Sequence, residues 1–516
     1  MDKVESARTV SRRQFLRSAT VVAGAAAGTA LLQPRPLVAA LPTRVAAAPR
    51  RPFEGQTLVI GGPPGPTITG PVRGHAKEWE ERTGGTLQVA GYPTPDLFDK
   101  IRSAIVTGTG AFDVIFYSSG WAADIMGSGF LREVPKDIIA KIDWDDIIPL
   151  YRERLLTWGG KIYSLPYDGD LHMYYYRKDL LLDPKNRTDF KARYGYEWDP
   201  EMGARTWEEY RDIAEFFTGW DWNKDGKPDY GAIETMGRKK SSFYFFFSRA
   251  SAYAKHPQDP AFFFDLEAMR SRVNNPGFVK GLENWINIIP FTPEGTIANG
   301  TAELRRDFIG GRCAQAFEWA DIGTLSYDVK RSVIKDKVGF SKLPGAKQTY
   351  NPKTKQWDNF PDLNYAPFIA FGGWIIGVTR TSKHPEAAFD LAAWLGGTDM
   401  SMRLCTEPDS GVNPFRESHF TNIKAWVEAG MSEESARRYM GAIRDSYTHP
   451  NAIIDLRIPG TVEYFDNLEI YTSQALAKQI SAQEALDQAA KAWDAITDRL
   501  GRDKQRKYYR DSLGIA

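Results

Sequence analysis

The chain has 516 residues, of which 42% are hydrophobic, a length and composition that allow two to four globular domains. The formal net charge is +1, and loss of the first forty residues would leave −3, because six basic and two acidic residues lie there; this argues against nucleic acid or an anionic membrane surface as a partner. The two cysteines, Cys313 and Cys405, are too few for an iron–sulfur cluster or a four-cysteine zinc site, so we expect no redox cofactor and leave their pairing open.

The first forty residues have the layout of an export signal. Arg12 and Arg13 precede an almost uncharged run, Ala19 to Leu32, and the small residues Val38-Ala39-Ala40 follow. Paired arginines before an apolar run favour the twin-arginine route. The run is shorter than the roughly 20 residues that span a bilayer. We therefore predict cleavage after Ala40 and a soluble periplasmic protein; the alternative is an uncleaved anchor or arm.

Strands and helices are expected to alternate after residue 55. Apolar and amphipathic runs predict a strand at 56–60, a helix at 75–82, a strand at 87–90, a helix at 96–107 and a strand at 112–116. This alternation implies a parallel sheet with helices on its faces. Ligands bind such sheets at the loops beyond the carboxyl ends of strands, which here are 61–74 and 117–121.

Several later elements have local signals of their own. Thr206 and Ser481 each begin a capping box that predicts a helix start. Pro385 occupies a first-turn position, and Gly396 ends the same predicted helix. The run 243–247 is interpreted as a buried helix face or a strand, and the polar segment 351–358 as a surface loop.

Five segments, in order, resemble the extracellular solute-binding proteins of carbohydrate-type ABC importers, and together they cover the mature chain. Gln315 departs from this family's pattern, in which Met is usual. The segments are Phe112-Asp113-Val114-Ile115 with Gly129-Phe130-Leu131, Ile162 to Tyr167 with Tyr174 to Leu180, Phe308 to Ala314 with Trp319, Gly372 to Val378 with Ser382 to Ala388, and Gly411 to Arg416.

The resemblance implies an α/β fold of the two-lobed periplasmic binding protein type (type II), with a mixed sheet and flanking helices in each lobe. Lobe one would comprise 53–165 plus 328–398, and lobe two 166–327 plus 399–516. A carbohydrate or polyol would be held in the cleft by a hinge closure and delivered to the permease subunits of an ABC transporter. The receptor would be a monomer and carry out no chemistry.

A sugar needs aromatic faces for stacking and paired polar groups for its hydroxyls. The aromatic candidates follow strand ends or glycines, and the alternative for each is packing in the core. For the carboxylates of Asp168 and Asp170, the alternative is an Asx turn at the surface. Arg457 either reaches the cleft or caps a helix. The predicted ligand residues are Ser118, Trp121, Tyr167, Asp168, Asp170, Trp319, Asp321, Gly373, Trp374, Asn413 and Arg416.

Residues 221–229 resemble a calcium-binding loop. Side-chain oxygens at Asp221, Asn223 and Asp225 precede Gly226, the carbonyl of Lys227 would be the next ligand, and Asp229 follows. This spacing matches the calcium loop as far as its ninth position, but Ala232 replaces the bidentate Glu, which excludes a standard EF-hand. We predict a structural Ca²⁺ site in lobe two; the alternative is a solvated turn.

Two other functions remain open on sequence alone. A secreted carbohydrate-active enzyme would need two carboxylates across a cleft, which sequence does not exclude, although the dinucleotide, zinc-protease and nucleophile-elbow motifs are lacking. A ligand receptor for a sensor would share every motif above.

Overall fold

The computed structural model describes residues 51–515. The predicted export signal and its cleavage site lie outside this range. No helix within residues 51–515 is long and apolar enough to cross a membrane.

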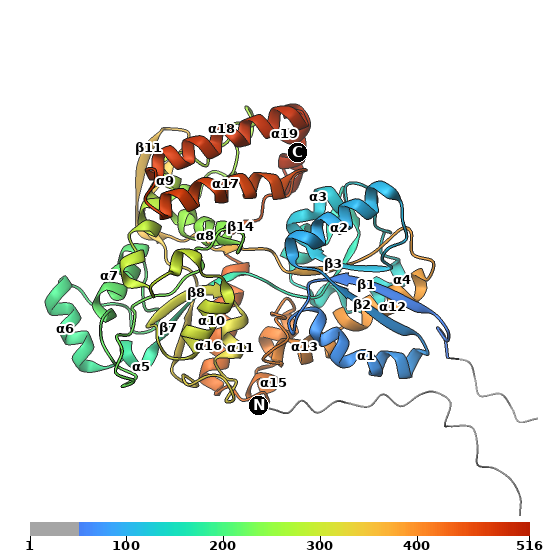
Figure 1. The fold of residues 1–516 in the computed structure, drawn as a ribbon, viewed down its shortest axis with the longest axis horizontal. Helices are drawn as coiled ribbons and strands as arrows, with labels where there is room; N and C mark the ends of the chain where they lie inside the picture. Colours follow the sequence, from blue (N-terminus) through green and yellow to red (C-terminus); the bar gives the residue numbers. More distant parts are fainter. Residues whose placement is uncertain (1–50, 516) are drawn as a thin grey trace, which may run out of the picture. The chain divides into compact units, whose positions relative to one another are not determined.

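A five-stranded sheet, labelled by β1 to β3 in Figure 1, contains the first strands of the chain. β1 is parallel to β2 and β3, as the strand–helix alternation predicts, but β13 runs antiparallel to β3 and β6. The sheet is therefore mixed. In spatial order its strands are β2 (Thr86–Gly91), β1 (Thr57–Gly62), β3 (Val114–Ser118), β13 (Trp374–Val378) and β6 (Ser164–Pro166).

Helices pack against this sheet: α1 against β2, α2 against β1 and α12 against β13. α12 begins at Pro385 and ends at Gly396, as its local signals predict. α1 begins at Thr69, earlier than expected, because Pro71 is tolerated in a first turn. The elements are α1 (Thr69–Thr83), α2 (Thr94–Thr107), α3 (Ala122–Ile125), α4 (Lys136–Lys141), α12 (Pro385–Gly396), the short turns η1 (Ser119–Trp121), η2 (Trp144–Asp146) and η3 (Tyr151–Leu155), and the hairpin β4 (Thr157–Trp158) with β5 (Lys161–Ile162).

A second sheet is antiparallel and three-stranded, in the order β8 (Gln315–Trp319), β7 (His172–Arg177) and β9 (Val338–Ser341). Every residue of these strands is buried. The polar Gln315 is accommodated because the Tyr174 hydroxyl donates to its Oε1 (2.7 Å) and its Nε2 donates to the Tyr210 carbonyl (2.6 Å).

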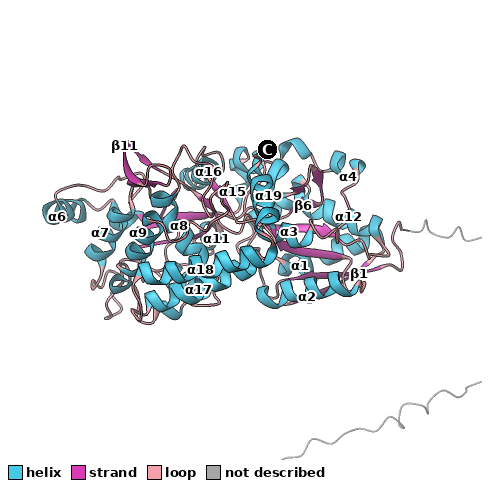
Figure 2. Ribbon diagram, turned by 90° about the horizontal axis from the view of Figure 1, so that it is seen from above, coloured by secondary structure: helices cyan, strands magenta, loops and turns pink. Residues whose placement is uncertain are grey.

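Most of the remaining helices lie around the second sheet or beyond it, and α17 and α18 run side by side in both views (Figures 1 and 2). They are α5 (Lys178–Leu181), α6 (Pro184–Tyr194), α7 (Trp207–Phe217), α8 (Ser242–Ala254), α9 (Pro276–Ile286), η4 (Ile289–Phe291), η5 (Thr296–Ala298), α10 (Thr301–Ile309), α11 (Asp321–Leu325), α13 (Thr398–Thr406), α14 (Glu417–Thr421), α15 (Ile423–Glu428), α16 (Glu433–Tyr447), α17 (Thr461–Leu476), α18 (Ala482–Leu500) and α19 (Arg502–Leu513).

Both predicted helix starts are confirmed, but each capping box forms only in its Ser or Thr half. The Ser481 side chain accepts from the Glu484 N–H (3.1 Å), and Thr206 from the Glu209 N–H (3.1 Å). The Glu209 carboxylate, however, accepts from the backbone and side chain of Arg205, so only half of that capping box forms. The run 243–247 belongs to helix α8, which decides between its two interpretations.

Segment 351–358 was expected to be a surface loop, but only residues 352–355 form a turn, and the residues on either side belong to strands. β10 (Ala346–Asn351) and β11 (Gln356–Asn364) form an antiparallel hairpin, in which Tyr350 lies opposite Trp357. The aromatic pair and the alternation of buried and exposed residues in β10 favour a strand over a loop.

The chain passes between the sheets more than once. Residues 167–171 lead from β6 to β7, and the two-residue strands β12 (Phe368–Ile369) and β14 (Ile453–Ile454) pair in parallel beside each other. β9 falls within the range expected for lobe one, yet it pairs with β7 in the second sheet. The remaining lobe boundaries stay a prediction. Cys313 and Cys405 are both free and buried.

Candidate functional site

Strand register brings several predicted ligand residues to one region between the two sheets. Trp374, at the start of β13, lies opposite Ser118, at the end of β3. His172, at the start of β7, lies opposite Trp319, at the end of β8. The segment 167–171 joins β6 to β7 and therefore passes between these two strand pairs.

Asp168 fixes this connecting segment to the first sheet. Its backbone N–H donates to the Trp374 carbonyl (3.0 Å), and its carboxylate accepts from the Trp374 N–H (3.4 Å) and the Asn413 N–H (2.8 Å). The close approach requires Gly373: φ there is +80°, and a Cβ atom would lie 1.8 Å from the Asp168 carbonyl oxygen. Gly373 thus makes room for the backbone of Asp168, and its predicted contact with a ligand stays a prediction.

Asn413 links three carboxylates. Its Nδ2 lies 3.3 Å from an Asp168 oxygen, 3.0 Å from an Asp170 oxygen and 3.4 Å from an Asp321 oxygen. Asp168 and Asp170 lie on the segment between β6 and β7, and Asp321 lies two residues after the end of β8. Four of the predicted ligand residues therefore form one buried cluster.

Two residues that sequence reasoning missed complete this cluster. Arg305 of α10 lies 2.6 Å from a Glu318 carboxylate oxygen and 3.2 Å from an Asp321 oxygen. Glu318 precedes the predicted Trp319 on a strand that is buried throughout. An acid between the aromatic residues Phe317 and Trp319 was the available signal, because an acid in such a buried run needs a charged partner. We call Asp168, Asp170, Glu318 and Asp321 with Arg305 the acidic cluster.

Burial disfavours ionisation of three acids in the acidic cluster, Asp168, Asp170 and Glu318. It raises the pKa of Asp168 to about 7, with the charge of Asp321 as a second cause, and raises the pKa of Glu318 to about 8 against the opposing effect of Arg305. The pKa of Asp170 is also raised, by burial and by its neighbours Asp168 and Asp321. The cluster therefore holds protons that free carboxyl groups would have lost at neutral pH.

A row of aromatic side chains lies beside these acids. Trp121 contacts Trp374 edge-to-face (6.3 Å between ring centroids), Trp374 contacts Phe371 (4.8 Å), Phe371 contacts Tyr244 (5.9 Å), and Tyr244 contacts Trp319 (5.7 Å). Each ring is buried, with at most 8% of its surface exposed. We call these five residues the aromatic row. Its members come from both sheets and from helix α8.

Asp455 is a further site residue that the sequence did not reveal. It is 4% exposed, and neither carboxylate oxygen has a hydrogen-bond partner of normal geometry. The Tyr244 hydroxyl, the Phe371 amide and Arg457 are near enough to lower its pKa, but burial outweighs them and raises that pKa to about 8. Its position two residues before Arg457 was the only hint.

Three other candidates use their polar groups elsewhere. The Tyr167 hydroxyl donates to the Ile68 carbonyl (2.6 Å). Arg416 donates to the carbonyls of Ile142 (2.9 Å) and Gly396 (2.5 Å), outside the acidic cluster. Arg457 donates to the carbonyls of Arg154 and Leu155, at the end of the helical turn η3, and to the Ser119 carbonyl (3.1 Å), so it caps that turn and presents no free guanidinium.

The Asp221–Asp229 loop folds around its own backbone. Asp221 accepts from the N–H groups of Asp225 (3.0 Å) and Gly226 (3.1 Å), while Asp229 accepts from Trp222 (3.0 Å) and Asn223 (3.3 Å). Within residues 51–515, no three His, Cys, Asp or Glu side chains converge as a metal site. The calcium site stays a prediction.

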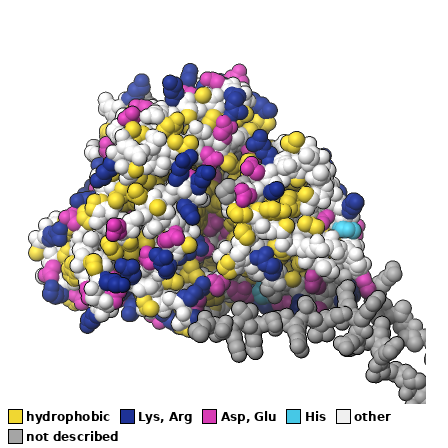
Figure 3. All heavy atoms as spheres, in the orientation of Figure 1, with side chains coloured by type: hydrophobic (Ala, Val, Ile, Leu, Met, Phe, Trp, Pro, Cys, Tyr) yellow, Lys and Arg dark blue, Asp and Glu magenta, His cyan; other side chains and the backbone are white. Residues whose placement is uncertain are grey.

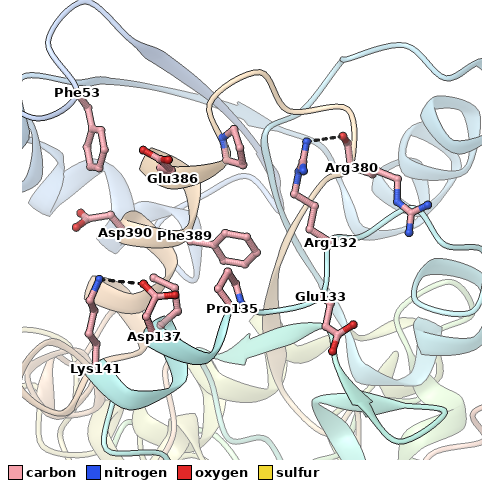
Figure 4. A pocket seen from close by; sticks show the side chains of 12 residues that line it. Phe53, Arg132, Glu133, Pro135, Asp137, Lys141, Arg380, Glu386, Phe389 and Asp390 are labelled. Carbon is pink, nitrogen blue, oxygen red and sulfur yellow. Dashed lines mark hydrogen bonds and ion pairs between the residues drawn. The ribbon is translucent and has the colours of Figure 1, made fainter.

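Surface hollows elsewhere on the described chain are lined by other residues. One, of about 790 Å³, lies between α4 and the start of α12 and includes Phe53, Arg132 and Phe389 (Figure 4). There Lys141 pairs with Asp137 (3.4 Å) and Arg132 donates to the Arg380 carbonyl (2.9 Å). Figure 3 shows acidic side chains along a different hollow, in the middle of the face it presents.

The comparisons with known proteins agree with this arrangement. Residues 75–430 match the family model of the bacterial extracellular solute-binding proteins. A probable amino-acid ABC transporter periplasmic-binding protein of Sinorhizobium fredii is 22% identical over 339 residues, which cover 64% of this chain and 66% of that protein. A mannitol-binding protein of Pseudomonas aeruginosa is 23% identical over 303 residues, which cover 58% of this chain and 59% of that protein. The chain thus spans less than two thirds of the length of these two relatives.

The fold is that of two-lobed periplasmic binding proteins. A crystal structure of an ABC transporter solute-binding protein from Agrobacterium radiobacter, in complex with ribitol, superimposes with a TM-score of 0.68 at 20% identity. The match covers 86% of this chain and all of that one. This confirms the expected fold class.

Proposed function

The chain belongs to the bacterial extracellular solute-binding proteins, and on this premise we propose that it is the substrate-binding component of an ABC importer. It captures a carbohydrate or polyol between its two sheets and delivers it to the membrane permease. Members of this family bind solutes for transport, so the alternative of a carbohydrate-active enzyme is set aside.

The observation that carries this proposal is the convergence of two kinds of side chain from both sheets. The aromatic row offers flat apolar faces, and the acidic cluster offers oxygen acceptors with Arg305 as a donor. Sugar and polyol ligands present C–H surfaces and paired hydroxyls, which match these two kinds of group. Mannitol and ribitol occur as ligands in the names of similar proteins, which supports the ligand class.

Binding would stabilise a closed arrangement of the lobes. Asp168 and Asp170 lie on a connecting segment, and Asn413 ties both to Asp321 beyond the second sheet. A ligand that contacts groups from both sheets binds the closed form better than the open one, and it shifts the equilibrium by that difference in affinity.

Export through the twin-arginine route places the receptor in the periplasm, where it would meet its ligand. The paired Arg12 and Arg13 support this route. Replacing both by Lys is expected to keep the protein in the cytoplasm while the purified variant still binds ligand. Unchanged export, measured by cell fractionation, would contradict the route but not the binding function.

A thermal-shift screen over sugars and polyols tests the binding function, because a ligand that binds only the native state raises its Tm by mass action. At a hundredfold excess over Kd the gain is about 2.7 kcal/mol. If no neutral or charged carbohydrate raises the Tm, the proposed ligand class is wrong. Turnover of labelled oligosaccharides by the purified protein would instead restore the enzyme alternative.

A further inference from the structure

The acidic cluster has more acceptors than donors. An amide nitrogen carries two hydrogens, but Asn413 Nδ2 lies within 3.4 Å of oxygens from three carboxylates, Asp168, Asp170 and Asp321. The cation of the acidic cluster, Arg305, pairs with Asp321 and Glu318 and not with the first two acids. At least one carboxylate therefore lacks a full set of partners.

Asp455 makes the deficit larger. It is nine-tenths buried and unpartnered at both oxygens. Its Oδ2 lies 3.1 Å from the place a Cβ would occupy on Gly120, next to Trp121, so a larger residue there would crowd the carboxylate. Both Asp455 and Asp170 raise the pKa of the buried Tyr244 hydroxyl.

The nearest cation to Asp455 does not neutralise it. Arg457 influences Asp455 electrostatically, but its guanidinium donates to the backbone carbonyls of Ser119 (3.1 Å), Leu155 (3.4 Å) and Thr157 (3.2 Å). A buried carboxylate without a hydrogen-bonded partner is costly, so Asp455 keeps a proton in the ligand-free protein. A cation brought by a ligand between the sheets would displace that proton to solvent and become the partner of the carboxylate.

The aromatic row favours the same kind of group. Tyr244 and Phe371 flank Asp455, and Trp121 and Trp374 follow them. Aromatic faces attract cations, and the attraction grows when water is excluded. A buried carboxylate next to several aromatic faces therefore suits a nitrogen cation better than a hydroxyl.

We propose that the ligand of this receptor carries a protonated nitrogen in addition to hydroxyl groups, so that its class is an amino sugar or amino polyol, and that Asp455 receives the nitrogen. This rests on the proposed function, which it narrows. The hydroxyls of the ligand bind the acidic cluster, and the ammonium lies between Asp455 and the aromatic row.

Isothermal titration calorimetry at pH 7.5 with matched ligand pairs tests this class. The pairs are glucosamine against glucose and 1-amino-1-deoxyglucitol against glucitol, with N-acetylglucosamine as a neutral amide. The amine of at least one pair is expected to bind ten times more tightly, or better, than its neutral partner. If, in every pair that binds, the neutral compound binds as tightly as its amine, the inference is overturned and the proposed function still stands. Failure of every amine and every neutral sugar or polyol to bind overturns both.

Two variants locate the nitrogen. Asp455→Asn should weaken the amine at least tenfold and its neutral partner less than threefold, whereas Asp362→Asn, on the exposed side of β11, should change neither. An amine preference that survives in folded Asp455→Asn removes Asp455 from the proposal. Circular dichroism and the Tm without ligand show whether each variant is folded. If Asp455→Asn does not fold, the titrations of the wild-type protein with the matched pairs still decide the ligand class.

Discussion

Asp168 and Trp374 hold each other in both directions: the Asp168 N–H donates to the Trp374 carbonyl at 3.0 Å, and the Trp374 N–H donates to the Asp168 carboxylate at 3.4 Å. This reciprocal contact joins the segment between the sheets to strand β13. Three predictions test this contact and the groups around it, and a fourth concerns the Asp221–Asp229 loop.

Gly373→Ala should destabilise the protein strongly. A Cβ atom at this position would lie 1.8 Å from the Asp168 carbonyl oxygen, and φ is +80°. We expect a loss of more than about 3 kcal/mol in the free energy of unfolding, from steric overlap and backbone strain together. Gly195→Ala is the matched control, because φ is +79° there and nothing lies within 4 Å. It should cost about 1 kcal/mol. Equal losses in urea denaturation would contradict the close approach.

Asn413→Asp should lower stability at neutral pH by about 2–4 kcal/mol, because it replaces the shared amide donor with a fourth acid among three carboxylates. Part of the loss should be recovered at pH 5, where the added acid can be protonated. Asn287→Asp at the exposed end of α9 should cost only a few tenths of a kcal/mol. Denaturation at both pH values measures the difference. A variant as stable as wild type at pH 8 would show that Asn413 does not link the acids.

Asp455 should make stability depend on pH in a defined direction. Burial raises the pKa of this acid from 3.8 to about 8, so between these values the native state holds a proton that the unfolded state has lost. Its contribution to stability is then present below about pH 4 and decreases as pH rises towards 8. Asp455→Asn should therefore gain stability relative to wild type, by an amount on the order of a few kcal/mol, between pH 5 and pH 8.5.

The comparison with Asp455→Asn cancels the other titrating groups, among them the buried His172 and His419, whose pKa values burial lowers. Asp362→Asn should show no such trend. A difference in the free energy of unfolding between wild type and Asp455→Asn that stays constant from pH 5 to pH 8.5 would refute the raised pKa of Asp455. The measurement uses ligand-free protein.

The Asp221–Asp229 loop should bind calcium weakly. Calcium prefers carboxylate and carbonyl oxygens, and the missing acid at the twelfth position should place Kd in the range of about 10⁻⁴–10⁻³ M. We expect millimolar Ca²⁺ to raise the Tm, Mg²⁺ to have little effect, and Asp221→Ala with Asp225→Ala to abolish the response. A Tm that is unaffected by calcium would identify the loop as a hydrogen-bonded turn.

Elements with local signals could be predicted from the sequence. α12 begins at Pro385 and ends at Gly396 because proline and glycine set those positions by their own backbone geometry. Ser118 and Trp121 could be assigned to a strand end because an apolar run precedes them. The hairpin of β10 and β11 was missed, since its exposed residues are polar and its pairing requires contacts across the turn.

The missed site residues have a different cause. Asp455, Tyr244 and Arg305 lie far apart along the chain. Asp455 directly follows β14, whereas Tyr244 lies on α8 and Arg305 on α10. No spacing rule relates them, and an acid such as Asp455 is indistinguishable in sequence from a surface residue until its burial is known. Tyr167 and Arg416 illustrate the reverse case: each lies in a motif near the site, but its polar atoms bind the backbone of another segment.

The edge-to-face contact of Trp121 with Trp374 has a spectroscopic consequence. Two indoles at 6.3 Å between centroids couple their electronic transitions, and any ligand that separates or reorients them changes that coupling. The receptor thus contains its own optical reporter, readable by near-ultraviolet circular dichroism without a label. Replacing either indole by Phe would remove the coupling and so show that the signal comes from this pair.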